Sequence, residues 1–142
     1  MIAVDTNILV YAHREEMSKH GAARDRLTRL AEGAERWCIP VFCMGEFLRI
    51  LTHPRLFDPP YSSQEGLEAV ERVLASPSLV ILNPGPDHVR LLVEAILESD
   101  ATGNLVFDAQ IVALCREAGV RSLLTEDRDF DRFRNFPTEH LR

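Results

Sequence analysis

Apolar residues follow two different spacings along the chain. Short apolar runs predict strands over residues 2–5, 36–40, 78–82 and 122–125. Longer stretches in which apolar residues recur every three or four positions predict helices over 19–33, 41–52, 87–99 and 105–118, with one more beginning after residue 62. Strands that alternate with helices imply a mostly parallel sheet covered by helices on both faces, which is an α/β fold.

Local signals indicate where some of these elements begin and end. Ser62 and Glu65 have the spacing of a capping box, so a helix is expected to begin there. Gly119 is expected to end the helix over residues 105–118. The apolar stripe of the helix after Ser62 is expected to consist of Leu67, Val70 and Leu74. The tail is expected to pack back on the protein through Phe130, Phe133 and Phe136.

Size and composition fit one ordinary globular domain over residues 1–142. Hydrophobic residues make up 46% of the chain and charged residues 27%. No apolar run reaches the roughly 18 residues that a membrane span needs, and no positively charged stretch precedes the first apolar residues as in a signal peptide. We therefore expect a cytoplasmic protein with no membrane partner.

Three cysteines, Cys38, Cys43 and Cys115, form no CxxC pair. An odd count without that spacing argues against a disulfide framework and against a zinc cluster. We expect all three to be small core residues.

Four acidic residues attract attention because of where they lie in these elements. Asp5 ends an apolar strand, and Asp127 follows the last strand. Ligands of open α/β sheets bind beyond the carboxyl ends of the strands. Asp108 shares its helix face with core positions 111, 112 and 115, where an unpartnered carboxylate would be costly to bury. Glu46 lies beside the apolar stripe of its helix.

Each acid also has a simpler interpretation. Asp5 could form an Asx turn or cap the next helix. Asp108 could be the N-cap of a helix that starts there, and Glu46 could be an exposed partner of Arg49. The alternating acids at 127, 129 and 131 resemble a calcium loop, but Arg132 and Thr138 replace its required Gly and Glu, so we reject an EF-hand. A strand-end turn with one or two inward acids fits better.

Clustered carboxylates indicate a specific chemistry. Such hard oxygen ligands suit Mg²⁺ or Mn²⁺ rather than zinc. Crowded carboxylates resist full ionisation without a cation, and one or two divalent ions would relieve their repulsion. The same ions would activate water for phosphodiester hydrolysis, so no protein nucleophile is required.

The net charge of −6 argues at first against a nucleic-acid partner. If the four acids share one metal site, however, the charge elsewhere is only about −2. No strong basic patch is evident. Two groups of basic residues, one near the first helix and one near the last acid, either line a channel for phosphates or are solvated surface: Arg14, Lys19 and Arg24, and Arg128 and Arg132.

Four segments in order resemble the motifs of PIN-domain proteins. They are residues 1–12 (MIAVDTNILVYA), the MGEFLR segment around Glu46, residues 103–109 (GNLVFDA) and residues 124–130 (LTEDRDF). The compact length and the LTHPR segment at 51–55 are most similar to VapC-type toxins of bacterial toxin–antitoxin pairs. The resemblance covers nearly the whole chain, and the four motifs in this order are specific.

The resemblance implies a three-layer α/β/α PIN-like domain whose sheet has about four to five strands. It also implies an endoribonuclease that depends on Mg²⁺ or Mn²⁺, forms a homodimer and is inhibited by a VapB-type antitoxin. Carried onto this chain, the metal would be held by Asp5, Glu46, Asp108 and Asp127, with Asp129 in place of or beside Asp127. Thr6, Thr125 and Asn104 could position water or brace the acids. Asp5 and Asp108 have arguments of their own, whereas Glu46 depends most on the resemblance.

Other functions remain open from the sequence. An aspartate-based phosphotransferase or receiver domain would need a late lysine, and no lysine follows Lys19. A module on the same fold could bind RNA or protein without cleaving, although all four acids are present. A PIN nuclease could also act in RNA processing outside a toxin–antitoxin system.

Overall fold

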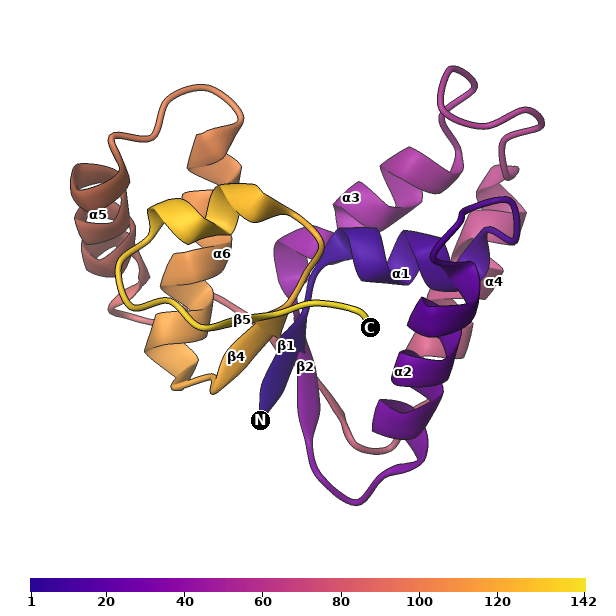
Figure 1. Ribbon diagram of the computed structural model, residues 1–142, viewed down its shortest axis with the longest axis horizontal. Helices are drawn as coiled ribbons and strands as arrows, with labels where there is room; N and C mark the ends of the chain where they lie inside the picture. Colours follow the sequence, from indigo (N-terminus) through magenta and orange to yellow (C-terminus); the bar gives the residue numbers. More distant parts are fainter.

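A parallel sheet of five strands forms the centre of the protein, which is described here by a computed structural model of residues 1–142 (Figure 1). The strand order is β3-β2-β1-β4-β5, and every neighbouring pair is parallel. The strands are β1 (Ile2–Val4), β2 (Trp37–Pro40), β3 (Leu79–Leu82), β4 (Ser122–Leu124) and β5 (Thr138–Glu139). This arrangement confirms the α/β fold expected from the alternating pattern.

Helices cover both faces of the sheet. The α-helices are α1 (Thr6–His13), α2 (His20–Glu32), α3 (Val41–Leu51), α4 (Ser63–Leu74), α5 (His88–Ser99) and α6 (Leu105–Ala118). A short 3₁₀ helix, η1 (Arg128–Arg132), follows β4. In Figure 1, α5 and α6 lie on one side of the sheet and α1 to α4 on the other. One core cluster of 29 buried residues joins the two sides through the strands.

The direction in which successive strands are added to the sheet reverses between β1 and β4. From β1 it runs outward through β2 to β3, and it then crosses back to β4 on the other side of β1. The register pairs Ile2 of β1 with Trp37 of β2 and with Ser122 of β4. β1, β2 and β4 are buried along their whole length, as central strands of a parallel sheet should be. Such a switch point leaves a crevice at the carboxyl ends of the strands.

Besides η1, which lies where a strand-end turn was expected, two elements of the fold were not expected from the apolar pattern. Residues 6–13 form helix α1, in which Ile8, Leu9 and Val10 are all buried. Because consecutive buried residues show no helical period, this segment does not resemble an amphipathic helix. β5 has only two residues, too few for a strand pattern to be recognised.

The expected buried stripe of α4 is wrong in part. Leu67 and Leu74 are about half exposed, at 54% and 50%, and the helix instead buries Gly66, Ala69 and Val73. A Cβ added at Gly66 would lie only 3.2 Å from Leu48 of α3, so small residues let the two helices approach closely. Size, rather than hydrophobicity, selects the contact face here.

Other local expectations are confirmed. Ser62 and Glu65 form the capping box of α4, and Gly119 ends α6 with a φ of 66°. Phe130 and Phe133 are buried and Phe136 packs against Phe130. All three cysteines are free and buried. No helix combines the length and the apolar character that crossing a membrane would require.

Candidate metal centre

The candidate acids come together at the switch point between β1 and β4. Asp5 directly follows β1, and Asp127 lies three residues beyond the end of β4. Asp108 lies on the first turn of α6, which begins at Leu105. Asp108 is therefore within its helix and is not its N-cap, a position that Asn104 occupies without a side-chain capping bond.

Asp5 is buried and held by four donors. Its Oδ1 accepts a 2.8 Å hydrogen bond from the Thr6 backbone N–H, and the Cys43 thiol lies 3.8 Å from the same oxygen. Its Oδ2 accepts bonds of 2.7 Å from the Thr125 hydroxyl and 3.1 Å from the Asn7 amide. Asp5 therefore both begins α1, as the simpler interpretation expected, and occupies a desolvated position with a fixed carboxylate.

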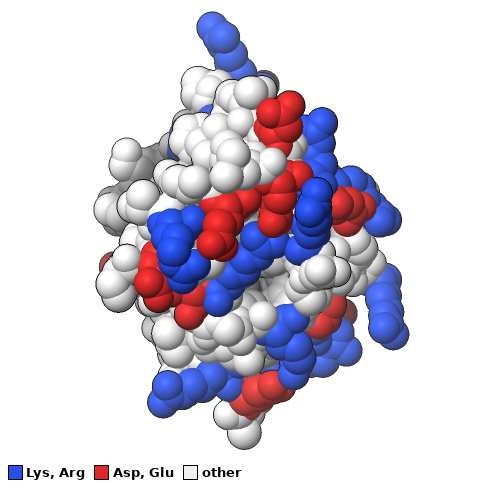
Figure 2. Space-filling model, turned by 90° about the vertical axis from the view of Figure 1, so that its left-hand side faces the viewer, with Lys and Arg blue, Asp and Glu red and all other residues white.

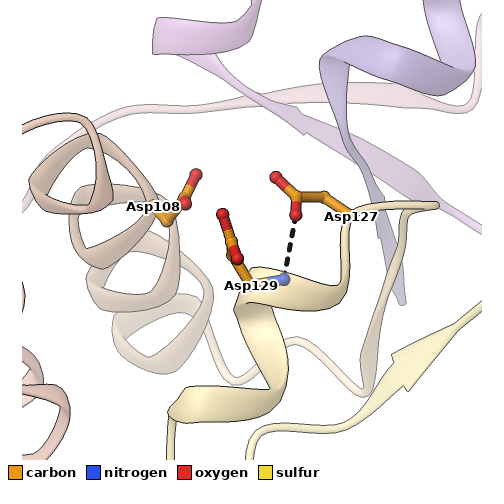
Figure 3. A group of neighbouring side chains, drawn as sticks. All are labelled: Asp108, Asp127 and Asp129. Carbon is orange, nitrogen blue, oxygen red and sulfur yellow. Dashed lines mark hydrogen bonds between the residues drawn. The ribbon is translucent and has the colours of Figure 1, made fainter.

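Three other carboxylates form an open cluster beside Asp5. One carboxylate oxygen from each of Asp108, Asp127 and Asp129 lies within 4.8 Å of the others (Figure 3). Asp127 caps η1 by accepting a 2.9 Å bond from the Asp129 backbone N–H. The carboxylates of Asp108 and Asp129 accept no hydrogen bond from the protein. Figure 3 shows Asp108 on α6 facing Asp127, which caps η1, and Asp129, which lies in η1.

Burial and mutual repulsion change the acidity of this site. Desolvation raises the pKa of Asp5 to about 6, although the hydrogen bonds from Thr125 and Thr6 act in the opposite direction. Desolvation also raises the pKa of Asp108 to about 7, and the charges of Asp127 and Asp5 add to this shift. The raised pKa values mean that ionising these two carboxylates is costly in the folded protein. A bound cation would offset that cost.

The remaining candidates occupy different positions around the cluster. Glu46 is exposed on α3 and forms no ion pair with Arg49, but its charge contributes to the raised pKa values of Asp5 and Asp108. The hydroxyl of Thr6 is buried without a hydrogen-bond partner. The hydroxyl of Thr125 links two acids, because it donates to Asp5 and accepts a 3.0 Å bond from the Asp127 backbone N–H.

Asn7 is a site residue that the sequence analysis missed. Its amide donates to Asp5 and to the Thr125 hydroxyl, and its carbonyl accepts a 3.2 Å bond from the Glu126 backbone N–H. Asn7 thus ties the start of α1 to the turn after β4. The signal that could have revealed it was a second polar residue close behind Asp5 at the carboxyl end of a buried strand.

The donor set fits a hard divalent cation. Every side chain of the open cluster offers carboxylate oxygens, without the sulfur or imidazole ligands that favour zinc. Asp108 and Asp129 have lone pairs that no protein donor occupies. Asp5 is not in the group within 4.8 Å, and both of its oxygens already accept hydrogen bonds. The structure therefore gathers Asp108, Asp127 and Asp129, with Asp5 and Glu46 beside them.

Comparison with known proteins gives the same fold and family. The family profile for the PIN domain matches residues 2–135. Ribonuclease VapC43 of Mycobacterium tuberculosis is 36% identical over 140 residues, which cover 99% of this chain and 95% of that protein. Ribonuclease VapC31 of the same organism is 35% identical over 144 residues, which cover 100% of this chain and 98% of that protein.

Solved structures support the fold at lower sequence identity. VapBC2 from Rickettsia felis, bound to a promoter DNA fragment, superposes with a TM-score of 0.75 at 19% identity, with both chains covered completely. Mycobacterium tuberculosis VapC20, a toxin that cleaves the sarcin–ricin loop, gives a TM-score of 0.68 at 18% identity and covers 92% of this chain and 93% of its own. From the profile match and the relatives above 30% identity, the chain belongs to the PIN-domain family and, within it, to the VapC ribonucleases.

Proposed function

We propose that this protein is an endoribonuclease that depends on Mg²⁺ or Mn²⁺ and acts as the toxin of a type II toxin–antitoxin pair. The observation that carries the proposal is the open cluster of Asp108, Asp127 and Asp129 at the switch point of the sheet. The membership of the chain in the VapC ribonucleases supplies the class of reaction, the hydrolysis of RNA phosphodiester bonds.

The proposed ligands divide into two groups by their surroundings. Asp108, Asp127 and Asp129 would hold the metal through oxygens that are open to it, and Glu46 would complete the site from its exposed position in the middle of α3. Asp5 would contribute through its remaining lone pairs, while its hydrogen bonds keep its carboxylate from turning. When bound, one or two divalent ions would activate the attacking water and stabilise negative charge on the phosphate.

The protein scaffold would keep these acids in place during the reaction. The Thr125 hydroxyl and the Asn7 amide join the ends of β1 and β4, so Asp5 and Asp127 keep their relative positions. The η1 cap formed by Asp127 fixes Asp129 in the same way. Preorganised charges of this kind are more effective than groups that must reorganise during the reaction.

RNA cleavage by the purified protein tests the proposal. A labelled RNA should be cut with Mg²⁺ or Mn²⁺, cutting should stop in EDTA, and Mn²⁺ should restore it. Asp108→Asn should lower the cleavage rate on the order of 100-fold or more, because the ligand that faces Asp127 and Asp129 is lost. Asp131→Asn is the matched control, because Asp131 is an exposed acid of η1 outside the cluster. Cleavage that continues undiminished in EDTA would refute the metal mechanism.

The proposal includes two protein partners. Structural neighbours include VapBC complexes, so a VapB-type antitoxin is proposed as the inhibitor. A second copy of the chain is proposed as the other partner, and an exposed apolar stripe of α5 supports it: Val89, Val93 and Leu97 are 69%, 51% and 78% exposed. Co-purification with the product of an adjacent gene and light scattering of the isolated chain would test these two partners. The RNA substrate would place the protein in the cytoplasm.

A further inference from the structure

Arg132 lies one turn of η1 beyond Asp129, a member of the acidic cluster. In a 3₁₀ helix, side chains three residues apart lie on the same face. The buried pair Phe130 and Phe133 follows this rule in the protein. Asp129 and Arg132 form the next such pair, and both are exposed. Arg132 therefore shares the face of η1 from which Asp129 enters the metal cluster.

Arg128 provides a natural comparison on the same short helix. It is exposed and shares the third face of η1 with Asp131, which is not part of the cluster. The two arginines thus have the same charge and are both exposed, but only Arg132 shares a face of η1 with Asp129, the candidate metal ligand within this helix. Neither side chain forms an ion pair or a hydrogen bond with the protein.

An unpaired arginine at this position could attract the phosphates of an RNA substrate. RNA must bring its phosphates to a site built from acids, in a protein whose net charge is −6. Figure 2 shows acidic side chains in a band across one face of the molecule, with basic side chains bordering the band instead of forming a separate patch. An arginine next to such acids offers planar, paired N–H donors that match the geometry of phosphate oxygens.

We propose that Arg132 binds a phosphate group of the RNA next to the metal cluster, and that Arg128 does not. This inference rests on the proposed function, because it names the substrate contact of that same site. Arg132 would orient the RNA backbone beside Asp127 and Asp129. The carboxylates alone would bind the metal.

The two arginines can be compared directly as Arg132→Gln and Arg128→Gln, which change the net charge equally. RNA affinity is measured by fluorescence anisotropy of a short labelled oligonucleotide with Ca²⁺ present, over a range of KCl concentrations. We expect Arg132→Gln to weaken binding on the order of 10-fold, as loss of a charge-assisted contact would. The slope of log affinity against log salt should become shallower by about 0.7, the value for one phosphate of a single strand. Arg128→Gln should change both far less.

Cleavage and metal binding provide the second readout. In Mn²⁺, Arg132→Gln should lower kcat/KM by a similar factor, and Arg132→Lys should restore part of it because a point charge replaces the paired donors. Affinity for Mn²⁺ in the absence of RNA should not fall, since removing a positive charge beside carboxylates cannot weaken their attraction for a cation. Equal RNA affinities for the two glutamine variants, or a loss of Mn²⁺ binding in Arg132→Gln, would overturn the inference. A wild-type protein that cleaves no RNA would instead refute the proposed function, while the affinity comparison would still test Arg132.

Discussion

The Thr125 hydroxyl donates a 2.7 Å hydrogen bond to Oδ2 of Asp5, across the boundary between β4 and β1. The same hydroxyl oxygen accepts the backbone N–H of Asp127. One buried side chain therefore connects an acid at the end of the first strand with an acid after the fourth. The candidate metal centre depends on this connection, because it holds together Thr125 and Asp5, which are 120 positions apart in the sequence.

Thr125→Val should damage the site while preserving the shape of the side chain. The variant leaves Asp5 short of a donor in a buried position, which costs about 1–3 kcal/mol of stability. We expect cleavage to fall on the order of 10-fold or more, because Asp5 and the turn before Asp127 lose their common anchor. Thr125→Ser keeps the hydroxyl and should retain most of the activity. Denaturant unfolding and single-turnover cleavage measure the two effects, and equal activity of the Val and Ser variants would contradict this role.

Asp108→Asn should stabilise the metal-free protein at high pH. The pKa of Asp108 is about 7 in the folded protein against 3.8 for an unperturbed group, so the folded state binds this proton more tightly than the unfolded chain does. The stability that protonation contributes is present at low pH and is lost as the pH rises from about 4 through 7. An amide never ionises and avoids this loss. In EDTA, the melting temperature of Asp108→Asn should exceed that of the wild type at pH 8 by a few degrees, with a smaller difference at pH 5.

Metal addition provides the control for this prediction. A divalent ion that binds the ionised carboxylates should raise the melting temperature of the wild type at pH 8 by mass action. The same addition should have less effect on Asp108→Asn, because a ligand is missing. A wild-type melting temperature that does not respond to Mn²⁺ would contradict the account.

Cleavage at limiting metal should rise with pH through the range of the two shifted acids. The pKa values of Asp5 and Asp108 are about 6 and about 7, so both acids still hold protons at pH values at which an ordinary carboxylate is already ionised. Protons and metal compete for the same oxygens. Raising the Mn²⁺ concentration should therefore move the midpoint of the pH–rate profile downward. A midpoint that does not depend on metal concentration would point to a titrating group outside the metal site.

Glu46→Gln should have a smaller effect than Asp108→Asn. Glu46 is exposed, whereas Asp108 faces two carboxylates within the cluster. Its charge still contributes to the raised pKa of Asp108, so its removal should lower that pKa. We expect activity to fall on the order of 10-fold and the acidic limb of the pH–rate profile to move to lower pH. A loss as large as that of Asp108→Asn would contradict this ranking of the two acids.

Much of the fold could be predicted because most elements have a regular apolar period. The strands at 36–40 and 78–82 and the helix at 105–118 agree with the structure to within a residue or two. α1 was missed because its consecutive buried residues have no such period. β5 was missed because a pair of residues such as Thr138 and Glu139 carries no pattern, and tertiary pairing with β4 alone defines it.

The candidate site was predicted as a set of acids, but their grouping depends on tertiary contacts. Asp5 and Asp108 were singled out because they lie at a strand end and on a core-facing helix stripe. The close approach of Asp129 depends on the 3₁₀ helix η1, whose cap is a hydrogen bond to Asp127. The double role of Asn7 depends on contacts with residues more than 100 positions away. No periodicity in the sequence reports such contacts.

The central claim, that these acids hold the metal, is tested most directly by a crystal structure of the protein soaked with Mn²⁺. The anomalous signal of the ion locates it without reference to any assumed ligand. The account predicts an ion whose distance to oxygens of Asp108 and of Asp127 or Asp129 is about 2.0–2.6 Å. An ion bound away from Asp108, or no ion at the ends of β1 and β4 at saturating Mn²⁺, would contradict it.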